Sequence, residues 1–133
     1  MSALSLKSVS KKYNGSLALD SISLEFAENR ITAVIGRSGC GQSTLLKACN
    51  GLVTPDRGQV QVNGHPLDYS NLAPLRRRIG YAVQGTGLFP HLSARQNITL
   101  LAALDGWQPQ RIQQRLHQLL QLTHLNADQL DKY

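Results

Sequence analysis

The chain has 133 residues, which suits one domain with a modest core and is too short for two. Hydrophobic residues make up 41% and charged residues 17%, ordinary values for a globular protein, and no run approaches the roughly 18 apolar residues of a membrane span. The net charge of +6 raises the question of a nucleic-acid partner. The one dense basic run, Arg76-Arg77-Arg78, has no aromatic residues between its members, so we expect a solvated face and no nucleic acid.

The first third of the chain is predicted to form strands. A short strand covers 4–9, and a second covers 17–26, where alternate residues are apolar. Asn14-Gly15 and Glu28-Asn29 are typical of turns after these strands. The apolar, β-branched run 31–35 predicts a strand that is buried on both faces.

Helices are predicted to dominate the rest. A helix over 43–50 should end at Gly51, and an exposed strand over 59–62 should precede a turn at Asn63-Gly64. A short helix at 72–76 and an apolar strand at 79–83 follow. Ser93 predicts an N-cap for a helix through Leu104. The last helix should start at Pro109, with its apolar face made by Ile112, Leu116, Leu119 and Leu120.

Two further features concern compartment. The N-terminus lacks a charged start followed by an apolar run, so the sequence predicts no secretory signal and the cytosol is the default compartment. Cys40 and Cys49 are nine positions apart and match no zinc-binding spacing, so we expect two free thiols.

A glycine-rich segment between the predicted strand and helix fits the phosphate-loop pattern G-x-x-x-x-G-K-[ST] at every position except the lysine. Its glycines would let the backbone form a nest of inward amides, and the following helix would direct its N-terminal amides at the same place. A hydroxyl from Ser43 would reach Mg²⁺. The candidate residues are Gly36, Arg37, Ser38, Gly39, Cys40, Gly41, Gln42, Ser43 and Thr44.

Gln42 occupies the position of the lysine. Losing a full positive charge about 4 Å from a phosphate would cost about 4 kcal/mol at an effective dielectric near 20, and about 1 kcal/mol in bulk water. A neutral amide hydrogen bond would recover about 1 kcal/mol. The sequence therefore predicts weakened nucleotide binding and a larger loss of hydrolysis, because charge builds up in the transition state.

The ordered motifs resemble the N-terminal portion of an ABC-transporter ATP-binding subunit of the bacterial uptake type. Tyr13 matches the aromatic residue that stacks on adenine, and Gln84 matches the Q-loop glutamine that contacts Mg²⁺ and senses the membrane subunit. The other landmarks are Gly51-Leu52, Pro55, Gly58, Gly64, the stretch 88–93 and Asn97-Ile98. The stretch 79–91 is similar to subunits that import quaternary-amine osmoprotectants, although amino-acid and sulfonate importers share much of it.

The resemblance implies an α/β fold: a P-loop NTPase core with an incomplete parallel sheet, an antiparallel β subdomain and the start of a helical subdomain. The β subdomain and core would occupy 1–90, and the helical start 91–133. It implies ATP and Mg²⁺ as cofactors, with Ser43 and Gln84 on the metal. The implied partners are a membrane permease, contacted through the Q-loop region, and a second copy, at the cytoplasmic face of the membrane.

The family's signature motif, Walker B strand, catalytic glutamate and switch histidine have no match in these residues. We therefore assign no catalytic residue, and whether the chain hydrolyses ATP stays open. Because the Walker B strand neighbours the phosphate-loop strand in the family, 31–35 should have an unpaired apolar edge. Two alternatives remain: a non-hydrolysing nucleotide-binding module that docks on a permease, and a truncated gene remnant without a role.

Overall fold

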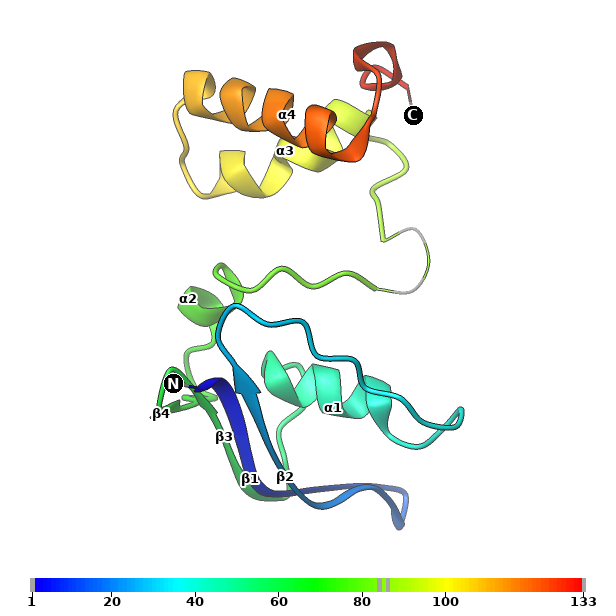
Figure 1. Cartoon of the computed structure of the whole chain (residues 1–133), viewed down its shortest axis with the longest axis vertical. Coiled ribbons are helices and arrows are strands. Elements are labelled where there is room, and N and C mark those ends of the chain that lie inside the picture. The colour runs from blue at the N-terminus through cyan, green and yellow to red at the C-terminus, as the bar shows by residue number, and fades with distance from the viewer. Residues whose placement is uncertain (1, 84, 86, 133) are drawn as a thin grey trace. The chain divides into compact units, whose positions relative to one another are not determined.

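In the computed structural model the described residues are 2–83, 85 and 87–132, and the chain forms two compact units, Met1–Gly80 and Tyr81–Tyr133 (Figure 1). Each unit has its own secondary structure and its own buried residues. Among the described residues, no helix combines the length and the apolar character that crossing a membrane requires.

The first unit is built on an antiparallel sheet with the strand order β2-β1-β3-β4. These strands are β1 (Ser2–Tyr13), β2 (Ser16–Ala27), β3 (Arg57–Val62) and β4 (His65–Pro66). The predicted turns are confirmed: Asn14 and Gly15 have φ of 47° and 84°, and Asn63 and Gly64 have φ of 50° and 79°. Two successive residues with positive φ suit the twist of a tight hairpin, which explains the Asn-Gly sequences.

The core of this unit lies between the sheet and helix α1 (Gln42–Cys49). Leu45 and Ala48 are the buried residues of α1, and the strands contribute Leu6, Val9, Leu19 and Val60. Leu6 and Val9 would point to opposite faces of a regular strand, because side chains alternate. A register shift between them, with Ser8 at φ 48°, brings both to the α1 side.

The remaining helices are short. Helix α2 (Ala73–Arg76) belongs to the first unit, and the second unit contains α3 (Ala94–Leu104), α4 (Pro109–Thr123) and a 3₁₀ turn, η1 (Ala127–Gln129). The predicted starts at Ser93 and Pro109 are confirmed, as is the apolar face of α4, where Leu116 is buried. Both cysteines are free thiols.

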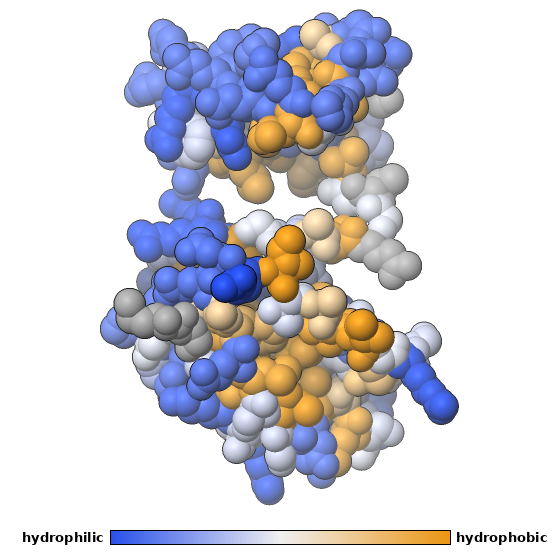
Figure 2. All heavy atoms as spheres, viewed as in Figure 1, coloured by the Kyte–Doolittle hydropathy of each residue, from blue (hydrophilic) through white to orange (hydrophobic). Residues whose placement is uncertain are grey.

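Two predicted strands are wrong. Segment 31–35 pairs with no described strand, and Ile31 and Ile35 are almost wholly exposed. Segment 79–83 also lacks strand structure, and Tyr81 and Val83 are 40% and 51% exposed. A doubly buried strand needs hydrogen-bonded neighbours and covering layers. The described residues supply neither. Figure 2 shows that the first unit exposes apolar surface.

Candidate phosphate-binding site

The phosphate-loop segment curls into a turn directly before α1. Gly39 and Gly41 have φ of 82° and 93°, in the left-handed region that glycine adopts without strain. The Cys40 amide donates to the Arg37 carbonyl oxygen at 3.1 Å and closes the turn. The segment is therefore not extended, in agreement with the predicted loop.

Gly41 packs directly against the backbone of β2. A Cβ at this position would collide with the carbonyl oxygen of Ala18 and lie 3.3 Å from Cδ2 of Leu19. Only glycine combines this close approach with a positive φ. Ala18 was not among the predicted site residues, because it acts through its backbone and no side-chain chemistry in the sequence signals it.

The first amides of α1 are open. The first helical bond runs from the Leu45 amide to the Gly41 carbonyl oxygen at 2.8 Å, and glycine at the N-cap has no side chain to cap the helix. In the loop and the first turn of α1, the backbone N–H groups of Gly39, Gly41, Gln42, Ser43 and Thr44 have no protein acceptor among the described residues. Such donors, together with the positive end of the helix dipole, favour an anion.

These groups border a small pocket of about 170 Å³. Its lining is formed by Ala18, Gly39, Gly41, Gln42, Ser43 and Thr44. Ser43 is exposed and Thr44 is half-buried, so a hydroxyl group is available beside the open amides. Backbone donors and a hydroxyl fit the phosphates of a nucleotide and an Mg²⁺ bound to them.

Gln42 makes a specific contact inside the loop. Its Nε2 donates to the Val34 carbonyl oxygen at 2.9 Å and ties the first residue of α1 to the segment before the loop. The side chain thus brings a neutral amide, and no full charge, to this part of the pocket wall. In the same loop, Sγ of Cys40 fills the space that a Cβ on Gly36 would need.

This pocket is not lined by Tyr13, Arg37 or Ser38. Tyr13, 46% exposed, is at the hairpin end of β1, with Nζ of Lys11 5.6 Å from its ring centroid. Lys11 also pairs with Asp56 at 2.8 Å, and this hydrogen bond, with one from the Lys12 amide, lowers the Asp56 pKa. Arg37 and Ser38 are exposed. Gln84 falls outside the described residues.

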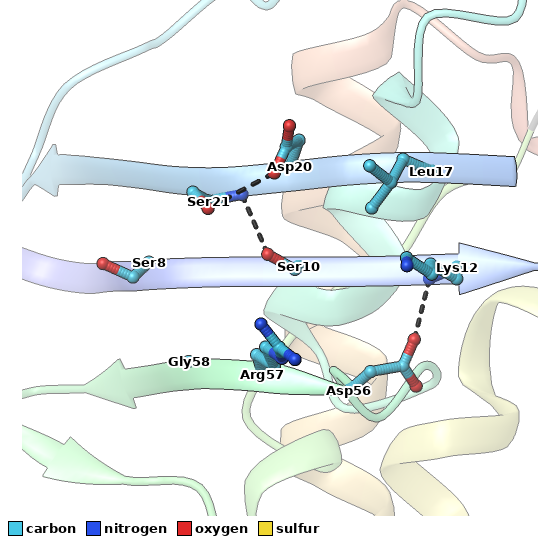
Figure 3. A pocket seen from close by; sticks show the side chains of 9 residues that line it. All are labelled: Ser8, Ser10, Lys12, Leu17, Asp20, Ser21, Asp56, Arg57 and Gly58. Atoms are coloured by element: carbon cyan, nitrogen blue, oxygen red, sulfur yellow. Dashed lines mark hydrogen bonds between the residues drawn. The ribbon is translucent and has the colours of Figure 1, made fainter.

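A second hollow, of about 660 Å³, lies over β1, β2 and the start of β3 (Figure 3). Ser8, Ser10 and Lys12 line it and alternate with buried Val9, so it lies on the other face of β1 from α1. Its polar groups bond largely to one another: the Ser10 hydroxyl oxygen accepts from the Ser21 amide at 2.9 Å, and Asp56 accepts from Lys11 and Lys12. The side-chain donors of Lys12 and Arg57 also line this hollow, whereas the open donors at the start of α1 are backbone amides.

The other end of α1 makes a contact that the sequence did not signal. Arg76 is exposed, as predicted for the basic run, but its Nε and Nη2 also donate to the carbonyl oxygens of Asn50 and Gly51, at 3.3 and 2.7 Å. The sequence signal was only a basic run, and the contact depends on how α2 packs beside α1.

The sequence of this chain is similar to those of known ATP-binding proteins. The family model for the ABC transporter matches residues 19–133. The glycine betaine/carnitine/choline transport ATP-binding protein OpuCA of Bacillus subtilis is 38% identical over 131 residues, which cover 98% of this chain and 34% of that protein. The glycine betaine uptake system ATP-binding protein YehX of Escherichia coli is 38% identical over 125 residues, covering 94% and 41%.

Among solved structures, the dimeric post-hydrolysis state of the ATP-binding cassette MJ0796 bound to ADP and Pi has a TM-score of 0.85 and 26% identity. The match covers 97% of this chain and 60% of that one. The chain spans about a third of the OpuCA length and two fifths of the YehX length. Because the family model matches most of the chain and the solved cassette aligns with nearly all of it, this protein belongs to the ABC transporter family, with the P-loop α/β fold of its ATP-binding cassettes.

Proposed function

We propose that this chain binds ATP with Mg²⁺ as part of the ATP-binding subunit of an ABC importer. The observation that carries the proposal is the set of open amides at residues 39 and 41–44, beside a pocket and at the positive end of α1. Gly41, Gln42 and Thr44 are half-buried. Because partly buried N–H groups are normally bonded within a protein, open ones at these positions favour a ligand with several oxygen acceptors. A polyphosphate is such a ligand.

The roles follow the family pattern. The backbone of 36–44 wraps the phosphates, the Tyr13 ring stacks on adenine, and Ser43 and Gln84 hold Mg²⁺, which neutralises phosphate charge. Binding is weaker than with a lysine at position 42, because the Gln42 amide carries no charge and already donates to Val34. Hydrolysis is reduced further, since the missing charge would act mainly on the transition state.

The transported solute is a quaternary amine such as glycine betaine or choline. The names of the OpuCA and YehX proteins, both 38% identical to this chain, refer to transport of glycine betaine, and that of OpuCA also to choline, which supports this class. The subunit would act at the cytoplasmic face of the membrane, bind a permease through the region around Gln84 and pair with a second ATP-binding subunit. The dimeric state of the MJ0796 cassette supports that pairing.

A titration of the purified 133-residue chain with a fluorescent ATP analogue, with and without Mg²⁺, tests the proposal. We expect saturable binding that weakens from ATP to ADP to AMP, because each phosphate adds acceptors for the open amides. Gln42→Lys should tighten ATP binding by about 10- to 100-fold, since a restored charge contributes roughly 1–3 kcal/mol net of the lost amide bond.

Gln110→Lys is the matched control, because it adds the same charge on the exposed start of α4. It should leave ATP affinity close to that of the unaltered chain. Equal affinities for ATP and AMP, with no gain from Gln42→Lys over Gln110→Lys, would contradict the proposal.

A further inference from the structure

Helix α2 holds the C-terminal end of α1 with two side chains from one face. Leu72 and Arg76 are four residues apart, a spacing that places them on the same side of a helical turn. The Leu72 side chain packs on Gly51, where a Cβ would lie 2.7 Å from Leu72 Cδ1. Gly51 has φ 71° and is buried, so it suits both the end of α1 and this close contact.

Arg76 completes the closure of this helix end. Its guanidinium donates to two successive carbonyl oxygens, of Asn50 and Gly51. Earlier carbonyls are bonded by the backbone: the Val53 amide donates to Lys47 and the Gly51 amide to Ala48, each at 3.1 Å. A cation at this end also opposes the negative pole of the helix, whose positive pole faces the phosphate pocket.

We infer that Arg76 is a positioning residue for the phosphate loop. Helix α1 has eight residues, too few to be stable in water alone, so its direction depends on tertiary contacts. Leu45 and Ala48 anchor its middle on the sheet, and Arg76 anchors its end. At 1.5 Å per residue the helix is about 12 Å long, so a tilt released at one end displaces the amides at the other. This inference rests on the proposed function, because its consequence is nucleotide affinity.

The test compares Arg76→Gln, Arg76→Lys and Arg78→Gln in the full chain. Arg78 belongs to the same basic run but has no side-chain hydrogen bond in the part of the chain that the structure describes, so it controls for charge. ATP affinity should fall roughly tenfold in Arg76→Gln, because a two-point charged contact is lost. Arg76→Lys should recover part of the loss, since an ammonium reaches one carbonyl, and Arg78→Gln should stay near the original value.

Hydrogen exchange supplies a readout that needs no nucleotide. In Arg76→Gln the amides of 45–49 should lose protection, while the ladder between β1 and β3 keeps its protection, because the side-chain hydrogen bonds of Arg76 go to Asn50 and Gly51 and not to those strands. Equal ATP affinity in Arg76→Gln and Arg78→Gln would overturn this inference alone. So would a uniform loss of protection across α1 and the sheet, which would indicate a general loss of stability. An unaltered chain that binds no ATP would overturn the proposed function first.

Discussion

The N-terminal ends of α1 and α3 are built in opposite ways. At α3, the Ser93 hydroxyl accepts from the Gln96 amide at 3.3 Å, and the Gln96 side chain accepts from the Ser93 amide at 2.8 Å. The next two amides, of Ala94 and Arg95, donate to the carbonyl oxygens of Lys132 and Leu130, each at 2.8 Å. At α1 the N-cap is Gly41, and the first amides have no protein acceptor among the described residues.

The difference favours a ligand-binding role for the start of α1. The same chain supplies a capping box and two extra carbonyls to one helix and none to the other, although uncapped amides cost stability. At α1 the loop also places two glycines with positive φ beside the open donors. An end left open at this cost suits a ligand that completes it.

The largest expected effect comes from the close approach of the loop to β2. Gly41→Ala should abolish ATP binding and destabilise the first unit by about 2 kcal/mol or more, because the new Cβ meets the Ala18 carbonyl oxygen at a positive φ. Thermal unfolding and an ATP titration measure both effects.

Gly39→Ala is the matched variant, since Gly39 also has a positive φ but no atom within 4 Å of its Cβ position. It should cost only the backbone strain, about 1 kcal/mol. Equal losses in the two variants would show that contact with β2 does not hold the loop.

The two cysteines offer a chemical probe of the open end. Cys40 is exposed in the loop, whereas burial raises the pKa of Cys49 on α1 to about 11. At pH 8 iodoacetamide should modify Cys40 well before Cys49, because the thiolate is the reactive form. Saturating ATP should slow the Cys40 reaction several-fold, as followed by mass spectrometry. A Cys40 rate that ATP does not change would argue against a ligand in the loop.

Removing the cap at the N-terminal end of α3 should have a smaller effect, on stability and not on ATP affinity. Ser93→Ala removes the cap of α3 and should lower stability by about 1 kcal/mol in a denaturant titration. ATP affinity should not change. A parallel loss of ATP affinity would break the contrast between the two helix ends.

The smallest effect depends on pH. The pKa of Asp56 is lowered mainly by the Lys11 hydrogen bond, so the folded state favours the carboxylate, and its contribution to stability is present at neutral pH. It is lost as the pH falls through the lowered pKa. Asp56→Asn should therefore be slightly less stable than the original chain at pH 7, and the gap in denaturation midpoint should close below about pH 4. A gap that is constant with pH would contradict this.

The features that the sequence predicted correctly depend on residues that are close together along the chain. The Asn-Gly turns, the Ser93 cap and the glycines of the phosphate loop each act within a few residues, and the structure has each as expected. Segments 31–35 and 79–83 were mispredicted because a buried strand depends on partners elsewhere. The contacts of Ala18 and Arg76 could not be predicted either, since each joins segments that are more than 20 residues apart.

The most direct test of the account follows backbone amide resonances while ATP is added to ¹⁵N-labelled protein. We expect large, saturable shifts for the amides of 41–44, with those of Ala94 and Arg95 unchanged. If millimolar ATP left 41–44 unshifted, or moved both helix ends equally, the open amides of α1 would not be a phosphate site.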